Sequence, residues 1–334
     1  MPDTIVLSLE EIEDLSFRAL VAAGTSEANA RPLAIATAAT EASGVASHGL
    51  AYIPIYAEHV QCGKVDGRAV PSVEQPKPSA VRVNAHSGFA HPAIDAGFEA
   101  LTSAARDQGI GVMTVFNSYN CGVLGHHAER IANEGLLGLC FTNAPASIAP
   151  TGGSKPVIGT NPFAMGVPGP DGPLFVIDQS ASAIAKSEIM LRNREGEALE
   201  EGWALDADGN STIDAAEALK GSMVPSGGAK GFGAGLMVEI FAACLSGAVL
   251  GKDASPFSGT VGGPPNTGQC FIAVDPGSLS GGAFADRAAA LAKAITAEEG
   301  ARLPGSRRSG ARDRTANGVE VDDALIERIR AFIA

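Results

Sequence analysis

The chain has 334 residues, a formal net charge of −13, and 45% hydrophobic and 18% charged residues. This composition predicts a compact soluble protein, and the length suggests two domains. The acidic balance disfavours nucleic acids and anionic membranes as partners, because both require basic surface, although a local basic pocket for a phosphate is compatible with it.

The first quarter of the chain is predicted to be helical. Ser8 and Glu11 form a capping-box pattern, and apolar residues follow at helical spacing, so we expect a first helix that ends at Gly24. The alanine-rich run from Ala28 to Ala42 predicts a second helix that packs closely against a neighbour. Ser47 to Gly49 would lie just past its end, where a histidine beside a serine and a glycine has the chemistry of an acid/base catalyst.

From Ser79 onward the pattern changes to strands bounded by Gly, Pro and Asn. Two β-branched segments, AVRVNAH and GIGVMTVFN, flank a helix expected over residues 93–108. Further strands are expected in LLGLCFTN, PVIGTNPFAMGVP, LFVIDQS and CFIAVDP.

The last third is expected to be mainly helical. Residues 231–250 are apolar enough to predict a buried helix, and two more helices are expected over 283–299 and 321–333. Between those two we expect a polar loop, 303–318, in an arginine-rich stretch that holds Arg302, Arg307, Arg308, Arg312 and Arg314.

The five cysteines are scattered and never form a C-x-x-C pair, so neither a zinc site nor a disulfide framework is predicted. No signal peptide pattern is visible at the N-terminus, and every apolar run is interrupted well short of the ~20 residues that span a bilayer. We therefore expect a cytoplasmic protein.

Glycine-rich segments raise the question of a nucleotide site. The chain has no G-x-G-x-x-G opening a βαβ unit and no phosphate-loop motif, which argues against an ordinary Rossmann domain. The segment PSGGAKG, at 225–231, nevertheless suits an anion: its glycines leave backbone N–H groups open, Lys230 adds charge, and an apolar helix begins there. A glycine-rich turn with a surface lysine is the competing interpretation.

Residues 206–217, DADGNSTIDAAE, imitate a calcium-binding loop, with oxygen ligands at the expected spacing. Ser211 stands where such loops need glycine, and no amphipathic helix precedes the segment. A turn between short elements is the favoured interpretation, and no metal site is predicted.

Taken together, the segments EASGVASHGLAYIPIY, NSYNCGVLGHH, GTNPFAMGVP, DQSASAIAKSEI, EGWALDADGNSTID, GSMVPSGGAKGFG and RLPGSRR resemble the malate/L-lactate dehydrogenase-like oxidoreductases over essentially the whole chain. The resemblance implies a mixed α+β fold with a non-Rossmann dinucleotide-binding domain, built on a large, mainly antiparallel sheet, and a helical domain formed by both chain ends. We place the helical domain at 1–75 with 275–334, and the NAD(P)-binding and substrate domain at 76–274. The resemblance also implies a homodimer.

The resemblance implies roles for individual residues. His48 matches the proton donor, with Ser47 beside it and Asp178 as the carboxylate that orients it. Thr160 and Tyr52 fall at substrate positions. The positions that match cofactor or substrate contacts, and that we assign to the cofactor, are Asn120, Gly122, Asn161, Ser180, Lys230, Gly305, Arg307 and Arg308.

Two positions depart from the common pattern of that family. Tyr52 stands where arginine can clamp a substrate carboxylate, and Asn120 stands where several hydroxy-acid dehydrogenases have histidine. The segment NSYNCGVLGHH is most similar to members that reduce Δ1-pyrroline-2-carboxylate and Δ1-piperideine-2-carboxylate.

We therefore expect an NAD(P)H-dependent reductase of cyclic imino acids, which needs one proton donor and one hydride. NADPH is favoured, with NADH as the alternative, because the arginines of 302–314 could meet a 2′-phosphate; an ordinary solvated face is the competing interpretation. The alternative function is a 2-hydroxy-acid dehydrogenase acting on malate, lactate or a relative. A more remote one is a non-catalytic dinucleotide-binding protein.

Overall fold

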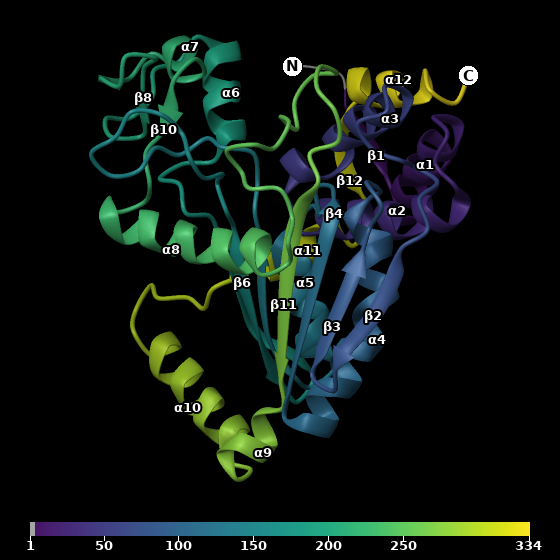
Figure 1. Ribbon diagram of the computed structural model, residues 1–334, viewed down its shortest axis with the longest axis vertical. Helices are drawn as coiled ribbons and strands as arrows, with labels where there is room; N and C mark the ends of the chain where they lie inside the picture. The colour runs from purple at the N-terminus through teal and green to yellow at the C-terminus, as the bar shows by residue number, and fades with distance from the viewer. Residues whose placement is uncertain (1–3) are drawn as a thin grey trace.

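A computed structural model describes residues 4–334 and shows a mixed α+β architecture centred on a seven-stranded sheet (Figure 1). The strand order is β2-β3-β4-β11-β5-β6-β7, and every neighbouring pair is antiparallel except β3 with β4. The strands are β2 Ser72–Lys77, β3 Ala80–Asn84, β4 Ile110–Ser118, β5 Leu137–Thr142, β6 Phe163–Gly169, β7 Gly172–Gln179 and β11 Thr267–Val274. The expected large, mainly antiparallel sheet is confirmed.

The sheet is covered by helices on both faces, so its central strands are apolar on both sides. Helices α4 Ala90–Gln108 and α5 Leu124–Asn133 pack on one face, over a core that includes Met113, Val115 and Phe271. Helix α8 Ala229–Glu239 and the π-helical turn η3 Ile240–Cys244 cover the other face, through Val238 and Ala242.

The two chain ends are joined into one helical region. Strand β1 Thr4–Leu7 pairs with β12 Val319–Asp322, and around this ribbon lie α1 Leu9–Ala22, α2 Glu27–Ala42, α3 Ile53–Gln61 and α12 Asp323–Arg330 (Figure 1). The buried side chains of Ile12, Leu33, Ile53 and Ile326 belong to its core. The predicted capping box at the start of α1 is confirmed, since the Ser8 and Glu11 side chains each accept a hydrogen bond from the other's backbone N–H.

Not every C-terminal helix joins this region. Helices α9 Pro276–Ser280 and α10 Phe284–Thr296 follow β11 and lie at the opposite end of the molecule from α1 and α12 (Figure 1). We propose a division into two units, a helical one made of 1–75 with 275–334 and a second one made of 76–274. Helices α9 and α10 belong to the first unit by sequence but lie away from its other helices (Figure 1).

The segment between β7 and α8 forms a small separate layer. It contains α6 Lys186–Glu195, α7 Ala215–Ala218 and a sheet of β8 Ala204–Leu205, β9 Ser211–Thr212 and β10 Ser222–Met223. In the turn from β8 to β9, Asp206 Oδ1 accepts from the backbone N–H groups of Asp208 and Asn210, both at 2.9 Å. The calcium-like sequence is therefore a hairpin turn held by its own aspartate, and no metal-binding cluster of His, Cys, Asp or Glu occurs between residues 4 and 334.

Two expectations for the last third are wrong. Residues 303–318 are not a loop, because α11 Ser306–Thr315 is helical and packs on α2, where Thr315 Oγ1 donates to Ala42 O at 3.0 Å. The apolar helix expected over 231–250 is not fully buried. Its outer side exposes large apolar side chains, namely Leu236, Met237, Ile240 and Leu245.

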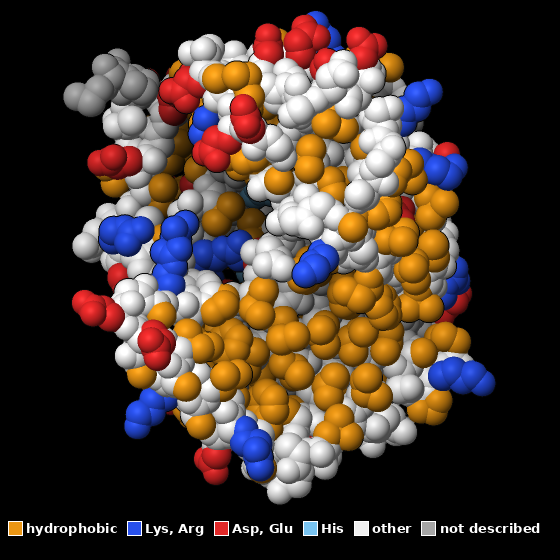
Figure 2. All heavy atoms as spheres, turned by 90° about the vertical axis from the view of Figure 1, so that its left-hand side faces the viewer, with side chains coloured by type: hydrophobic (Ala, Val, Ile, Leu, Met, Phe, Trp, Pro, Cys, Tyr) orange, Lys and Arg blue, Asp and Glu red, His pale blue; other side chains and the backbone are white. Residues whose placement is uncertain are grey.

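The face on which α8 and α10 lie in Figure 1 has a broad apolar area, and Figure 2 shows hydrophobic side chains covering much of its lower part. Leu291 of α10 is exposed as well. All five cysteines are free, and none of the helices in the described part of the chain is long and apolar enough to cross a membrane.

Candidate active site

Ser47 and His48 lie in a tight turn between α2 and α3, made of η1 Ala46–His48 and η2 Leu50–Tyr52. Glu41, in the last turn of α2, reaches across and accepts a hydrogen bond from Leu50 N at 2.6 Å. A side chain at Gly49 would overlap this carboxylate, so the glycine lets Glu41 approach the backbone. Glu41 therefore fixes the turn that presents His48. The sequence interpretation missed it, although a lone acidic residue in an alanine-rich helix was the available signal.

His48 has a polar neighbour on one side and an aromatic one on the other. Its Nδ1 lies 3.0 Å from Ser47 Oγ, and its ring stacks on Tyr52 with the centroids 5.5 Å apart and the planes 19° from parallel. When the ring is protonated, its Nδ1–H donates to the Ser47 hydroxyl and its Nε2–H is left for a substrate. Burial lowers the pKa of His48, while the charge of Asp178 raises it and that of Arg308 lowers it.

Asn120, after β4, is held from two sides. Its Oδ1 accepts from the Tyr56 hydroxyl at 3.2 Å and from Gly122 N at 2.6 Å. Burial raises the pKa of the Tyr52 hydroxyl, and the Asn120 side chain partly opposes this rise. The segment from Asn120 to Gly122 therefore lies against the His48 turn, through two tyrosines of the helical region.

Asp178, near the end of β7, links three segments. Its Oδ2 accepts from Gly125 N at 2.9 Å and forms an ion pair with Arg308 Nη2 at 2.8 Å. No hydrogen bond joins Asp178 to His48 in the described chain; the two interact through charge, and Ser47 is the group at Nδ1. The direct orienting contact expected from Asp178 is thus absent from this geometry, although the carboxylate does lie in the site.

Backbone hydrogen bonds bring three further motif segments together. Ala181 N donates to Thr160 O, and Ser226 N donates to Ala181 O, both at 2.8 Å. These bonds place the turn that contains Thr160, the segment after β7 and the PSGG turn side by side. The Ser180 hydroxyl lies 3.0 Å from that of Ser182 in the same region.

The side chain of Asn161 is not free to contact a cofactor, because it is buried and both of its polar atoms are hydrogen-bonded within the chain. Its side chain is buried, its Nδ2 donates to Glu239 Oε2 at 2.7 Å and to Gly235 O at 2.9 Å, and its Oδ1 accepts from Ala144 N at 3.2 Å. Both ends of the amide are therefore occupied in joining β6 to α8. The left-handed backbone, with φ of +41°, suits an asparagine at this turn.

Lys230 and Arg307 are exposed, and no recorded contact in residues 4–334 ties either of them to the His48 group. Lys230 lies in the first turn of α8, which follows Gly227 and Gly228, both with positive φ and open space where a side chain would be. Figure 2 shows Lys and Arg side chains gathered beside a hollow on this face of an otherwise acidic protein. Open backbone N–H groups with nearby cations suit the phosphates of a dinucleotide.

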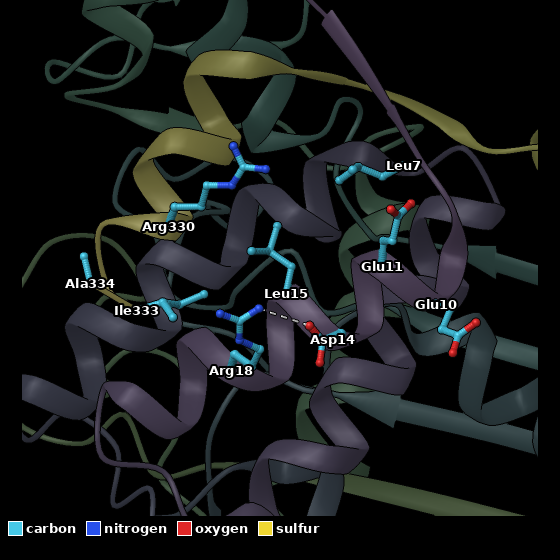
Figure 3. Close-up of a pocket in the computed structure, with 9 residues that line it drawn as sticks. All are labelled: Leu7, Glu10, Glu11, Asp14, Leu15, Arg18, Arg330, Ile333 and Ala334. Carbon is cyan, nitrogen blue, oxygen red and sulfur yellow. Dashed lines mark hydrogen bonds and ion pairs between the residues drawn. The ribbon is translucent and has the colours of Figure 1, made fainter.

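A second hollow lies on the helical region and contains none of the candidate site residues. Figure 3 shows it between α1 and the C-terminal residues, lined by Leu15, Ile333 and several charged side chains. Two of its cations are already paired along the chain, Arg18 with Asp14 at 3.4 Å and Arg330 with Glu327 at 2.8 Å. Its chemistry is that of an ordinary helical surface.

Known proteins resemble this chain along its full length. A family model described as malate/L-lactate dehydrogenase matches residues 7–330. The chain is 40% identical over 327 residues, 98% of either sequence, to a (2R)-3-sulfolactate dehydrogenase (NADP(+)) of Chromohalobacter salexigens. It is also 40% identical over 339 residues, 99% of this chain and 98% of the other, to a Δ1-pyrroline-2-carboxylate reductase of Ancylobacter novellus.

Solved structures give the same fold. Δ1-piperideine-2-carboxylate reductase from Pseudomonas syringae superposes with a TM-score of 0.93 and 35% identity over 98% of this chain and 100% of the other. Sulfolactate dehydrogenase from Methanocaldococcus jannaschii superposes with a TM-score of 0.90 and 26% identity, over 98% and 96% of the two chains.

Proposed function

The chain belongs to the malate/L-lactate dehydrogenase family and is an NAD(P)-dependent oxidoreductase, and within that family we propose that it reduces cyclic imino acids. The substrate would be Δ1-pyrroline-2-carboxylate, converted to L-proline, or Δ1-piperideine-2-carboxylate, converted to L-pipecolate. Relatives named for these activities are 36 to 40% identical to the chain.

The reaction needs two additions to a C=N bond: a hydride at carbon and a proton at nitrogen. The bound nicotinamide, when reduced, supplies the hydride. The imidazolium form of His48 supplies the proton from Nε2 and becomes neutral, while Nδ1 keeps its proton beside Ser47. Tyr52 supports one face of the imidazole. Asp178 favours the imidazolium form through its charge.

The observation that carries this proposal is the state of Asn120. Its amide oxygen accepts from Tyr56 and Gly122, so position 120 contributes a fixed hydrogen-bonding group and no acid or base. A cyclic imine is satisfied by the single proton donor His48. Asn120 and Tyr56 then shape the space beside it.

NADPH is the proposed cofactor. Arg307 is exposed at the start of α11 and Lys230 is exposed at the start of α8, so both are available to phosphate groups. Gly122, with φ of +67°, and Ser180 would contact the nicotinamide half. A relative at 40% identity whose name gives NADP(+) as its cofactor supports this preference.

A 2-hydroxy-acid dehydrogenase is the second candidate, because the sulfolactate dehydrogenase is as similar to the chain as the imino-acid reductases are. In that reaction His48 would take the hydroxyl proton. A non-catalytic dinucleotide-binding protein is a more remote alternative, and the assembled His48 site argues against it.

The test is oxidation of NADPH and of NADH, followed by absorbance, with Δ1-pyrroline-2-carboxylate, Δ1-piperideine-2-carboxylate, pyruvate, oxaloacetate and sulfopyruvate measured side by side. We expect kcat/KM to be at least about tenfold higher for an imine than for any keto acid, which corresponds to ~1.4 kcal/mol of transition-state binding. A higher value for a keto acid would move the chain to the second candidate. Cofactor binding without any turnover would favour the non-catalytic one.

We also propose that the enzyme is a homodimer, with the apolar area of Figure 2 as the interface. Leu236, Met237 and Ile240, in α8 and η3, are each 42 to 51% exposed. Contiguous apolar surface such as Figure 2 shows on this side of the molecule is typical of subunit contacts. Light scattering should give a dimer for the native protein and a monomer for Ile240→Lys. A native monomer at micromolar concentration would refute the proposal.

A further inference from the structure

Arg308 is placed in the site by the turn that begins α11. Gly305 has φ of +81°, and a side chain on it would come within 2.9 Å of Val176 O and 3.3 Å of Val176 N. The absence of that side chain lets the turn lie directly on the backbone of β7. Arg308 N donates to Gly305 O at 2.9 Å, so Arg308 projects from a fixed turn. That turn lies on Val176 of β7, which is two residues before Asp178 in the same strand.

The guanidinium is held on one side only. Its Nη2 pairs with Asp178 Oδ2 at 2.8 Å, and the same oxygen accepts from Gly125 N at 2.9 Å. A side chain at Gly125 would overlap the guanidinium, so Arg308 rests against that backbone. The side chain of Arg308 is 27% exposed and that of Asp178 only 11%. An arginine has five N–H donors, and this ion pair uses the inner edge of the group.

The neighbouring arginines differ from it. Arg312 has both terminal nitrogens on the Glu129 carboxylate and its Nε on Ser43 Oγ at 3.2 Å, so it joins α11 to α5 and α2. Arg307 is exposed. The negative charge of Asp178 raises the pKa of His48, and the positive charge of Arg308 lowers it.

We infer that Arg308 binds the carboxylate of the substrate beside the proton donor, and that Asp178 positions Arg308 for this task. The inference rests on the proposed function, in which the substrate carries a carboxylate on the carbon that receives the hydride. A planar guanidinium can hold Asp178 at one edge and a second carboxylate at another. When the carboxylate of the imino acid is bound there, the C=N bond of the same molecule would lie close to His48.

This role competes with the one first expected for Arg308, contact with a cofactor phosphate. The two roles differ in what an arginine variant loses. A carboxylate anchor discriminates between a charged ligand and its neutral amide, whereas a phosphate contact changes the affinity for NADPH and leaves that discrimination intact.

The experiment compares the native enzyme with Arg308→Lys, Arg308→Ala and, as matched control, Arg307→Ala. Calorimetry on the enzyme–NADP⁺ complex measures binding of pyrrole-2-carboxylate and pyrrole-2-carboxamide, flat mimics of the cyclic imine, and of oxamate and oxamide, mimics of a keto acid. Fluorescence measures the Kd for NADPH, and circular dichroism confirms that each variant is folded.

We expect Arg308→Ala to lower the affinity for the two carboxylates by roughly 10- to 100-fold, as for loss of a hydrogen bond to a charged group. Its affinity for the two amides should fall by less than about threefold. Arg308→Lys should recover part of the loss. Arg307→Ala should leave the charged-to-neutral ratio unchanged. The Kd for NADPH should stay within about threefold in the Arg308 variants.

Equal weakening of charged and neutral ligands, or weaker NADPH binding with the ligand ratio unchanged, would overturn the inference. The inference would also be overturned if the native enzyme bound neither carboxylate more tightly than the corresponding amide. Discrimination confined to oxamate, without imine turnover, would instead refute the imino-acid substrate and retain the Arg308 contact.

Discussion

Glu41 Oε1 accepts the backbone N–H of Leu50 at 2.6 Å, across the turn that carries His48. The two residues are nine positions apart, and the bond closes the segment containing Ser47, His48 and Gly49 into a fixed shape. A carboxylate from α2 is in this way a positioning group for a histidine that it does not contact.

Replacing Glu41 tests that role. Glu41→Ala removes the acceptor, leaves a buried N–H unpaired at a cost of ~1–3 kcal/mol in stability, and should lower kcat by about 100-fold because the imidazole is displaced. Glu41→Gln keeps a carbonyl oxygen in the same place and should lie within about fivefold of the native kcat. Steady-state kinetics and thermal melts check both variants, and an unimpaired Glu41→Ala enzyme would remove this residue from the account.

The pKa of His48 should respond to its two charged neighbours in opposite directions. Burial lowers it below the usual 6.5 in the free enzyme, Arg308 lowers it further and Asp178 raises it. Arg308→Ala should therefore move the titration of the His48 ring to higher pH, and Asp178→Asn should move it to lower pH. An NMR titration, with the ring signal assigned by its loss in His48→Gln, measures these shifts; movement in the same direction for both variants would contradict the geometry.

Tyr52 should contribute through its ring. It stacks on His48 at 5.5 Å. Tyr52→Phe keeps the stack and should retain kcat within about threefold, whereas Tyr52→Ala should lower it by about tenfold or more, since the loss of an aromatic contact of ~0.5–1.5 kcal/mol is joined by a looser imidazole. A Tyr52→Phe enzyme as impaired as Tyr52→Ala would assign the effect to the hydroxyl.

Acid should destabilise the fold through two buried histidines. His91 and His127 are 5% and 2% exposed, their rings lie 5.6 Å apart, and burial lowers the pKa of His91 to about 3 and that of His127 well below its usual value. Because both folded-state values are depressed, only the unfolded chain takes up these protons as the pH falls below 6.5. Stability is therefore full above that pH and is lost below it.

Each of the two groups should cost about 1.4 kcal/mol per pH unit below 6.5 until its folded pKa is reached. Urea unfolding at pH 7.5 and 5.5 measures the loss, and His91→Gln should show a smaller difference between the two pH values than the native protein. An identical pH dependence in the variant would show that His91 is charged or accessible in the folded state.

Local sequence signals anticipated the local structure. The Ser8–Glu11 pattern and the alternation around Met113 and Val115 act within one helix or one strand, so they were readable without a structure. The polar stretch 303–318 predicts a loop because its arginines carry no apolar periodicity; the helix there is set by contacts with α2 and α5. The apolar composition of 231–250 gave no sign of which side faces outward.

The site depended more heavily on resemblance to known proteins. His48, Asn120, Asp178 and Arg308 come from four distant segments, and nothing in the spacing of such residues reveals that Tyr56 reaches Asn120 or that Asp178 pairs with Arg308. The roles of Glu41 and Asn161 arise from three-dimensional packing: Glu41 bonds a backbone N–H nine residues further along its own motif, and Asn161 bonds Glu239, which lies outside its motif.

The most direct test of the central claim, that His48 protonates a cyclic imine, compares native enzyme and His48→Ala in the NADPH-dependent reduction of Δ1-pyrroline-2-carboxylate. Loss of the general acid should lower kcat by about 100-fold or more, while the Kd for NADPH stays within about threefold. Equal turnover by the two proteins would contradict the account, because the proton would then come from elsewhere.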